Sequence, residues 1–472
     1  MYLSIPRGVA LLAALCLVFA LMLTACAGGG AASGSDPTET TPLETLPDLT
    51  DDRTPADTTS YLNRLYTAFA MAEPAPASDF DYASDNVGVT VTGYKGGEVV
   101  LVIPETIDGL PVIAISEGAF EGKGSLKALS IPDSVTVIGK GALKGCQAMT
   151  TLRTPVVTCT AAPYFGALFG AETHETNASF VPRSLATLII TDGQGMETVP
   201  DCCFYDCPME AIFLPRSVTA LGAFSFYNCD KLRVLPLAET ALESVGERAM
   251  AGCANLADLT LPATVERMSL GMLEGCGNLS TLTIPFVGTE REPSADKPTP
   301  RYLGYLFGAA DYTFTEGYMP VSLIRVTLLE GCGDIPANAF FGCSFLREVV
   351  LPADVTTVGY RAFYRCERLA SIHLPASVTT LEEDTFRGCI RLQSVSGGEG
   401  LRTLGLQVFM SCVSLETLTL PATVTHLPNA AFAGCRSLTT LTAPGVTSCG
   451  EQVFRHCDKL EGWAETVTTA AN

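Results

Sequence analysis

A unit of about 23 residues recurs through most of this chain, and this repetition restricts the possible fold more than any other feature. One copy runs from Ala362 to Leu381, with the pattern A-F-x-x-C-x-x-L-x-x-L-x-L-P-x-x-V-x-x-L. The cysteines mark the register in two regular series: Cys207, Cys229, Cys253 and Cys276, and then Cys343, Cys366, Cys389, Cys412, Cys435 and Cys457. Cys146 is an earlier member, and Lys123 holds the same slot one period before it, which gives twelve units in register.

The physics of such a unit predicts a solenoid. One short coil cannot bury its own apolar side, so successive coils must share one continuous core. The L-x-x-L-x-L segment predicts a strand whose central leucine points inward, and neighbouring coils should pair these strands in parallel at about 4.8 Å. We therefore expect leucine-rich repeats with a parallel β-sheet on the concave face, the remainder being mostly β and irregular coil. The V-x-x-L-G-x-x-A-F segment should return the chain and insert its apolar side chains into the same core.

The 18 cysteines need an explanation in an exported chain. One inward-facing cysteine per coil forms a ladder, and a free thiol there behaves as a small buried hydrophobe. Ladder positions about 4.8 Å apart with parallel Cβ directions do not suit a disulfide, whose Cβ atoms lie about 3.8 Å apart. We expect reduced ladder thiols, and core positions for Cys203 and Cys449. The states of Cys159, Cys202 and Cys332 stay open, including a disulfide made by Cys159 or Cys202.

The N-terminal residues indicate export. Residues 1–25 carry one positive charge, Arg7, and an apolar run that ends Leu23-Thr24-Ala25-Cys26. This resembles a lipoprotein signal peptide with lipidation at Cys26; the alternatives are an ordinary signal peptide or a single membrane anchor. Residues 26–80 have the composition of a flexible, acidic, Pro/Thr/Ser-rich tether.

Both ends of the solenoid need a cover. At residues 81–115 we expect an N-terminal β-hairpin cap, in which the alternating segment Val87–Tyr94 pairs with Val99–Ile103 across Gly96-Gly97. The solenoid should then occupy residues 116–463, with Leu460 and Trp463 closing the last coil. Residues 464–472 read as a loose tail.

Two gaps in the cysteine series match each other. The segment F-G-A-L-F-G-A at 165–171 reappears as L-G-Y-L-F-G-A at 303–309, and each is followed by a proline and a further apolar strand. The gaps therefore predict a duplicated block with enlarged coils near 156–200 and 286–336. Two interpretations are open: the loops form a recognition edge, or their aromatic residues pack inward and replace the missing A-F-x-x-C turn. The polar stretch Thr289–Arg301 should be exposed to solvent in either case.

Composition and motifs give no sign of catalysis. The net charge of −21 repels nucleic acid and anionic lipid headgroups. The four histidines stand in none of the usual nucleophile–base or zinc motifs, and no phosphate-binding loop or EF-hand is present. We expect no enzyme activity, no catalytic residues, no cofactor and no metal site.

The outward face of the sheet is the first candidate for binding. Residues on either side of the inward strand leucine should point away from the core. They include Thr151 and the candidate binding residues Thr281, Thr283, Ser371, His373, Thr417, Thr419, Thr440 and Thr442. The band of small hydroxyls is either a flat polar platform for a protein or glycan, or a consequence of threonine being a good exposed strand former.

The sequence resembles the BspA-like leucine-rich-repeat surface lipoproteins of bacteria. The resemblance rests on the A-F-x-x-C unit, the lead-in I-P-E-T-I-D-G-L-P-V at 103–112 and the two F/L-G-x-L-F-G-A blocks, and it covers roughly residues 87–463. It implies a solenoid displayed on the bacterial cell surface, in a family associated with adhesion, and transfers no ligand or catalytic residue.

We therefore expect an extracytoplasmic protein, anchored to the membrane through lipid on Cys26, that binds an extracellular protein or glycan and no nucleic acid. The alternative is a glycan-capture lipoprotein serving nutrient uptake. Its mark would be aromatic platforms on the sheet face, where Phe213 stands nearly alone. A hydrolase using one enlarged loop is disfavoured, because the sequence shows no nucleophile–base pair.

Overall fold

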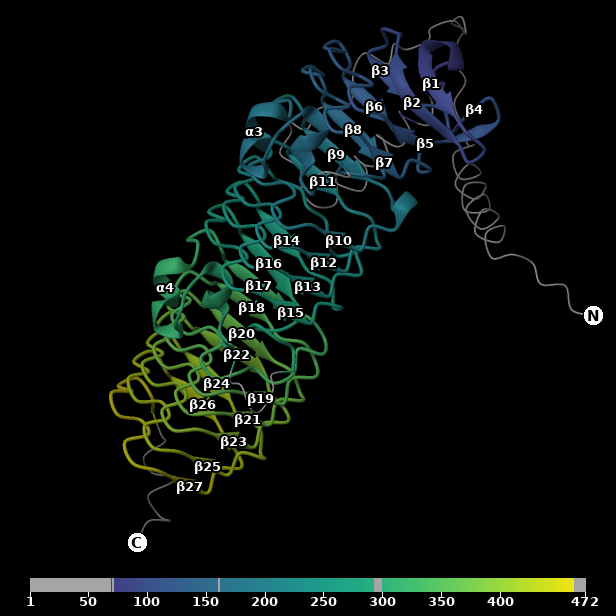
Figure 1. Ribbon diagram of the computed structural model, residues 1–472. Coiled ribbons are helices and arrows are strands. Elements are labelled where there is room, and N and C mark those ends of the chain that lie inside the picture. The colour runs from purple at the N-terminus through teal and green to yellow at the C-terminus, as the bar shows by residue number, and fades with distance from the viewer. Residues whose placement is uncertain (1–68, 70–71, 160–161, 293–298, 462–472) are drawn as a thin grey trace, which may run out of the picture. The chain divides into compact units, whose positions relative to one another are not determined.

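The structure is a computed structural model, and it describes residues 69, 72–159, 162–292 and 299–461. From Phe80 onward these residues form an elongated stack of coils built mostly of short strands (Figure 1). The signal peptide at 1–25, Cys26, most of the tether, Trp463 and the tail at 464–472 lie outside the described residues. The stack is the leucine-rich-repeat solenoid that the sequence predicts.

The first ladder of parallel strands comes from the L-x-L segments. In each strand the central apolar residue points into the core, as Leu282 and Val326 do where they stand opposite each other in adjacent coils. The strands of this first ladder are β3 (Val100–Val102), β6 (Ala128–Ser130), β8 (Thr151–Thr154), β9 (Thr187–Ile190), β11 (Ala211–Phe213), β14 (Asp258–Thr260), β16 (Thr281–Ile284), β17 (Arg325–Leu328), β18 (Glu348–Val350), β20 (Ser371–Leu374), β22 (Ser394–Gly397), β24 (Thr417–Thr419) and β26 (Thr440–Thr442).

A second ladder of parallel strands lies on the returning V-x-x-L segments, where the sequence indicated only a turn. Thr380 and Leu381 pair with Thr403 and Leu404 in the next coil, for example, and both leucines are buried. The strands of this second ladder are β2 (Val89–Tyr94), β5 (Leu110–Ile115), β7 (Val137–Ile138), β10 (Thr198–Val199), β12 (Ala220–Leu221), β13 (Ser244–Val245), β15 (Arg267–Met268), β19 (Thr357–Val358), β21 (Thr380–Leu381), β23 (Thr403–Leu404), β25 (His426–Leu427) and β27 (Ser448–Cys449).

The glycine that follows the second-ladder strand is needed because the coils approach closely at this point. A Cβ atom on Gly359 would stand 2.7 Å from the Ile335 carbonyl oxygen and 2.8 Å from the Ala337 nitrogen. No side chain fits there without moving the backbone.

The cap contains a hairpin, but with a different partner from the predicted one. Strand β2 pairs antiparallel with β1 (Phe80–Ser84), while the segment expected to be its partner is β3, which pairs in parallel with β6 as the start of the first ladder. The prediction was wrong because Phe80–Ser84 lies at the end of a segment with tether composition. A small second hairpin joins β4 (Thr106–Ile107) to β5.

The core is a column of phenylalanine rings beside a column of thiols. The rings of Phe340, Phe363, Phe386, Phe409, Phe432 and Phe454 stack face to face, with neighbouring centroids 5.0–5.9 Å apart and planes within 10°. Nine ladder thiols donate a hydrogen bond of 2.9–3.3 Å to a carbonyl oxygen of the preceding coil: Cys146, Cys229, Cys253, Cys276, Cys366, Cys389, Cys412, Cys435 and Cys457.

All described cysteines are free thiols, so the disulfide left open for Cys159 or Cys202 is not formed. Cys203 is buried as predicted. Cys449 stands opposite Leu427 in the register, which confirms its slot, yet it is only partly buried because it lies in the last strand of the stack. Leu460 packs against the core as a partly buried residue.

Each gap in the cysteine series holds one enlarged coil with short helical turns. The first contains η2 (Phe165–Phe169), η3 (His174–Thr176), α3 (Asn177–Phe180) and, after β9, η4 (Asp192–Gln194); the second contains η5 (Leu303–Phe307), η6 (Tyr312–Phe314) and α4 (Thr315–Tyr318). A further short turn, η1 (Ala77–Asp79), precedes the cap. The helices α3 and α4 stand on the same edge of the stack (Figure 1).

The enlarged coils affect the two ladders differently. The first ladder continues through both of them, because β9 joins β8 to β11 and β17 joins β16 to β18. In the second ladder, the described residues form no strand pairing from β7 to β10, and from β15 to β19 they form only the isolated bridges of Arg267 with Glu290 and of Ile335 with Val358. Each enlarged coil therefore interrupts one sheet and leaves the other continuous.

Arg291 spans the second interruption, which corrects the expectation of solvent exposure for the described residues of the stretch at 289–301. Its side chain is only 17% exposed, donates to Glu266 and to the carbonyl oxygens of Ala263, Val265 and Gly331, and lies over the Phe286 ring. Thr289 and Thr299 are likewise partly buried. In this stretch the Arg291 side chain makes hydrogen bonds across the missing strand, while the Thr289 and Thr299 hydroxyls are buried without a hydrogen-bond partner among the described residues.

Candidate functional site

The outer face of the first ladder differs between its two halves. In β6, β8, β9 and β11 the outward positions are covered: Thr151, Thr187 and Ile189 are all buried. The prediction that Thr151 faces solvent was therefore wrong, because this half carries buried apolar residues such as Ile189 and Phe213 at outward positions. From β14 onward the outward positions are mostly exposed. Among the described strands of the first ladder, the outer face is therefore most open from β14 onward.

The eight candidate residues lie on this open half. Thr281 and Thr283 are partly exposed, and the other six, Ser371, His373, Thr417, Thr419, Thr440 and Thr442, are exposed. Register places Thr417 beside Thr440 and Thr419 beside Thr442, so the hydroxyls form two short rows. His373 and Ser396 are also neighbours, with Nδ1 and Oγ 3.1 Å apart. The structure thus brings these residues onto one face.

The aromatic segments of the enlarged coils pack inward. Phe165, Leu168 and Phe169 in the first block are buried, as are Leu303, Leu306 and Phe307 in the second. Their backbones take the place of the A-F-x-x-C turn, since Leu143 N–H donates to the Leu168 carbonyl and Leu273 N–H to that of Leu306, both at 2.8 Å. This confirms the interpretation in which they replace the missing turn.

The first enlarged coil is tied to its neighbour by a buried asparagine. The Asn177 side chain accepts from the Gly166 N–H at 3.1 Å and donates to the carbonyl oxygens of Cys203 and Tyr205. His174 stacks edge-on against Tyr205 with centroids 5.3 Å apart. These contacts give Asn177 of α3 and His174 of η3 a structural role.

The second enlarged coil differs from the first in what it exposes. Phe314, Tyr318, Val321 and Ile324 are 60%, 48%, 66% and 38% exposed. We call these four residues the apolar patch. The equivalent residues of the first block are Thr176, Phe180, Arg183 and Ala186. The two blocks therefore share the buried segment at 165–171 and 303–309 but differ in the residues that follow it on the surface.

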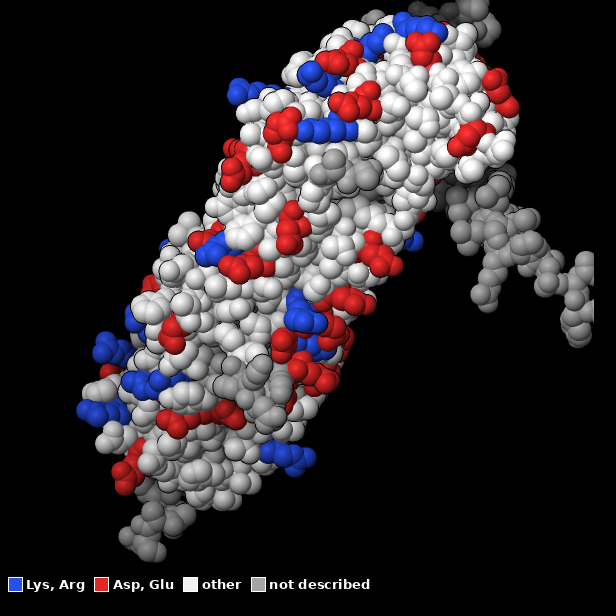
Figure 2. All heavy atoms as spheres, viewed as in Figure 1, with Lys and Arg blue, Asp and Glu red and all other residues white. Residues whose placement is uncertain are grey.

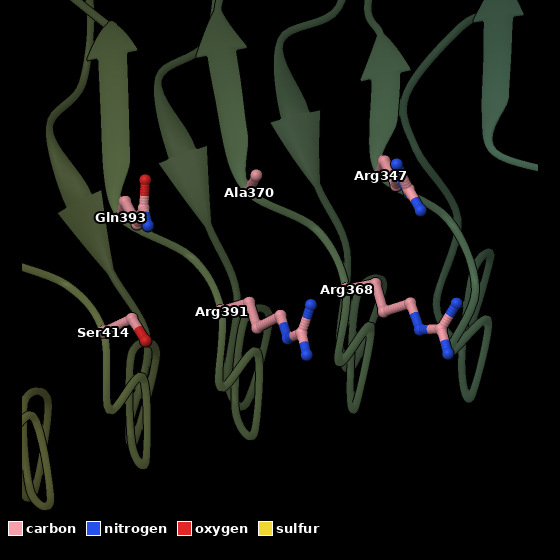
Figure 3. A pocket seen from close by; sticks show the side chains of 6 residues that line it. All are labelled: Arg347, Arg368, Ala370, Arg391, Gln393 and Ser414. Atoms are coloured by element: carbon pink, nitrogen blue, oxygen red, sulfur yellow. The ribbon is translucent and has the colours of Figure 1, made fainter.

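A shallow groove of about 490 Å³ lies just after the second enlarged coil. It is lined by Arg347, Arg368, Ala370, Arg391, Gln393 and Ser414, and we call it the arginine groove. Figure 3 shows Arg368 and Arg391 extending side by side from adjacent coils, with Arg347 at the start of a neighbouring strand. On the face seen in Figure 2 most of the surface is uncharged, and the charged side chains stand in small groups of mixed sign.

The arginine groove was missed in the sequence although its signal was there. Arg368 and Arg391 each precede the first leucine of their unit, and the same slot in the coil before them holds Phe345. When the residues directly before the first leucine of each unit are compared, two successive coils carry arginine there, in a chain with a net charge of −21.

The titratable groups of the core do not form a reactive site. Burial raises the pKa of the Cys146 thiol to about 11 and those of Cys276 and Cys389 to about 12, so these thiols stay protonated as hydrogen-bond donors. Among the residues that the structure describes, no group of three or more His, Cys, Asp or Glu side chains could hold a metal ion. In the same part of the chain, no helix has the length and apolar character needed to span a membrane.

Known proteins resemble the chain through its repeats. The family model described as a BspA type leucine rich repeat region, in 6 copies, matches residues 111–164, 176–292 and 320–461. Among curated proteins, no relative matches the sequence significantly.

Solved structures with a similar chain include a leucine-rich repeat protein from Bacteroides ovatus, with 20% identity over 81% of this chain and 92% of that one and a TM-score of 0.36. A leucine rich cell surface protein from Faecalibacterium prausnitzii shows 21% identity, coverage of 83% and 94% and a TM-score of 0.30. The pneumococcal vaccine antigen PcpA shows 17% identity, coverage of 79% and 86% and a TM-score of 0.26. Since the family model matches well over half of its length, this chain belongs to the BspA-type leucine-rich-repeat family.

Proposed function

We propose that this chain is a lipid-anchored bacterial surface protein that binds macromolecules through its solenoid, in adhesion or another protein–protein interaction. Leucine-rich-repeat arrays are binding scaffolds as a rule, because stacked coils present an extended rigid surface. The observation that carries the proposal is the open outer face of the first ladder from β14 onward, where Thr417, Thr419, Thr440 and Thr442 are all exposed.

The binding test compares two sets of four lysines. The full chain is screened against arrays of extracellular proteins and of glycans, together with a variant carrying Lys at Thr417, Thr419, Thr440 and Thr442. A control carries Lys at Thr403, Thr425, Thr447 and Ser448, which are exposed positions on or beside the second ladder with the same added charge. Protein ligands that are lost only in the first variant support the proposal.

Other outcomes count against it. Protein ligands that survive both sets of substitutions mean that this face is not the site. Glycan ligands would favour the glycan-capture alternative, although its expected aromatic platform is absent at Phe213, which is only 5% exposed. An array on which nothing binds would overturn the proposal of a binding module.

The anchor is tested separately, since Cys26 lies outside the described residues. The full chain and its Cys26→Ser variant are expressed in a bacterium fed an alkyne-tagged fatty acid. Label on the first chain and not on the second supports lipidation at Cys26. Label on neither would leave the chain with an ordinary signal peptide or a single membrane anchor.

A further inference from the structure

Exposed apolar residues concentrate in one part of this solenoid, and three arginines that form no ion pair among the described residues lie in the same part. Six of the ten large hydrophobic residues exposed in the described chain fall between residues 314 and 390: the apolar patch, Val350 and Ile390. The three arginines of the groove come from the same coils, and none of them forms an ion pair within the described residues.

The carboxylates nearest in sequence are already paired with other arginines. Glu348, next to Arg347, is held by Arg325 at 2.6 Å, and Glu367, next to Arg368, is held by Arg365 at 3.1 Å. Arg368 itself lies over the Phe345 ring, 5.1 Å from its centroid, which holds its guanidinium in place. The groove therefore offers preorganised positive charge that the protein does not neutralise.

Backbone hydrogen bonds place Ile324, one residue of the apolar patch, next to the groove. The Arg347 N–H donates to the Ile324 carbonyl at 2.8 Å, the Ala370 N–H to that of Arg347 at 3.3 Å, and the Gln393 N–H to that of Ala370 at 2.9 Å. These four residues thus occupy one slot in four successive coils. The row begins with an exposed isoleucine of the apolar patch and continues into the arginine groove.

We propose that this row binds an extended segment of a partner protein in which a run of acidic residues is joined to a run of apolar ones. The proposal deepens the proposed function, because it names a site and a partner class for the same binding module. Guanidinium groups form paired hydrogen bonds with carboxylates, which selects an acidic ligand. Aromatic residues and arginine are also the side chains enriched at protein–protein contacts.

The dimensions suit such a segment. Four coils at about 4.8 Å each span roughly 15–20 Å, which about six extended residues cover. The apolar run would lie over Val321 and Ile324, and the acidic run over Arg368 and Arg391. A polysaccharide would satisfy the arginines, and Phe314 and Tyr318 offer it ring faces, but the aliphatic Val321 and Ile324 match apolar peptide side chains instead.

The first test measures binding of defined peptides to the full chain by fluorescence anisotropy. The probe is a fluorescein-labelled peptide with a Leu/Val/Tyr half and a Glu/Asp half, made in both orders. Its comparison ligands are the same peptide with the apolar half replaced by serine, the same peptide with Gln and Asn for Glu and Asp, and polygalacturonate. We expect only the complete peptide to bind well, and its binding to weaken as salt rises.

The protein variants separate the two halves of the site. Arg368→Gln with Arg391→Gln should lower affinity at least tenfold and flatten the salt dependence. Val321→Ser with Ile324→Ala should lower affinity about tenfold without changing the salt dependence. Both side chains are exposed, so folding should be unaffected. The control is Arg402→Gln with Arg436→Gln, which removes the same charge from exposed positions elsewhere.

The outcomes are distinct. Equal binding of polygalacturonate or of the serine-substituted peptide would overturn the proposal in favour of a general anion site. Binding of the complete peptide that the groove variant leaves unchanged would overturn it as well. If protein ligands found on the array still bind the groove variant and the patch variant, this site is refuted and the proposed function stands. If the peptide binds but the protein array is blank, this site stands and the proposed function is refuted.

Discussion

The Sγ atom of Cys366 lies 3.2 Å from the carbonyl oxygen of Phe340 in the preceding coil. The same carbonyl accepts the N–H of Cys343 at 3.1 Å, so each turn carbonyl receives one bond from its own coil and one from the next. The thiol column is therefore a series of hydrogen bonds between coils as well as a series of small apolar groups. A cysteine suits this slot because it is apolar enough for the core and still carries a donor.

The thiol column predicts a loss of stability at alkaline pH. Burial raises the pKa of the Cys146 thiol to about 11 and those of Cys229, Cys276 and Cys389 to about 12, above the ordinary value. Stability from a raised pKa is fully present below the unfolded pKa of about 8.5 and is lost as pH rises toward the folded value. Each such thiol should cost about 1.4 kcal/mol of unfolding free energy per pH unit in this window.

The measurement is denaturant unfolding between pH 8 and pH 11. The Cys276→Ala, Cys389→Ala double variant should start less stable and show a shallower decline with pH than the parent chain. An identical slope in the two proteins would mean that other groups cause the alkaline loss.

The phenylalanine column predicts that position in the stack decides the cost of a substitution. Phe386 is fully buried between Phe363 and Phe409, with centroids 5.2 and 5.4 Å away. Phe386→Ala should cost about 3–5 kcal/mol, because it leaves a cavity that stacked coils cannot close. The matched change Phe454→Ala, at the partly buried end of the column, should cost clearly less. Equal losses in chemical unfolding would contradict the stacked arrangement.

Arg291 should be sensitive to a change that keeps its charge. Its guanidinium reaches Glu266 and three carbonyl oxygens across the gap in the second ladder, which the single ammonium of a lysine cannot do. We expect Arg291→Lys to lower the unfolding free energy by about 1–3 kcal/mol. The control is Arg216→Lys, whose ion pair with Glu239 is about 80% exposed and should change stability by less than about 0.5 kcal/mol.

A single methyl group at Gly166 should disturb the first enlarged coil. A Cβ atom there would overlap the Asn177 side chain, which also holds the next coil through Cys203 and Tyr205. Gly166→Ala should destabilise the protein by about 1–3 kcal/mol. At Gly277 a Cβ atom would meet no other atom within 4 Å, so Gly277→Ala should be neutral or slightly stabilising. Thermal unfolding of the two variants decides the matter.

The repeat explains why much of the fold could be predicted. One cysteine and one phenylalanine per coil define the register, and register alone places Leu282, Val326 and their equivalents in the core. Most of the second ladder could not be predicted because, from β7 onward, its strands are only two residues long, as at Thr380–Leu381, and show no alternation. The sequence pattern predicts that the Val and Leu side chains of these segments point inward, but it does not predict that the backbones of neighbouring coils pair there.

The candidate site was predictable only in part. Alternation puts Thr417 and Thr419 on the outer face of their strand, and they are exposed there. The same rule fails at Thr151, because alternation says which way a side chain points and not whether something covers it. Arg368 and Arg391 lie before their strands, so a search for residues on the sheet face passes over them.

The interrupted second ladder also bears on how the array responds to load. At both enlarged coils, bending that opens the first ladder is resisted by the backbone hydrogen bonds of β9 and β17 with their neighbouring strands. Bending that opens the opposite side meets, among the described residues of the second enlarged coil, isolated bridges such as that of Arg267 with Glu290 and the side-chain hydrogen bonds of Arg291. At the enlarged coils the array should therefore be easier to bend open on the side of the second ladder than on the side of the first. A protein of this kind pulled by flowing fluid would flex in that direction at its duplicated blocks.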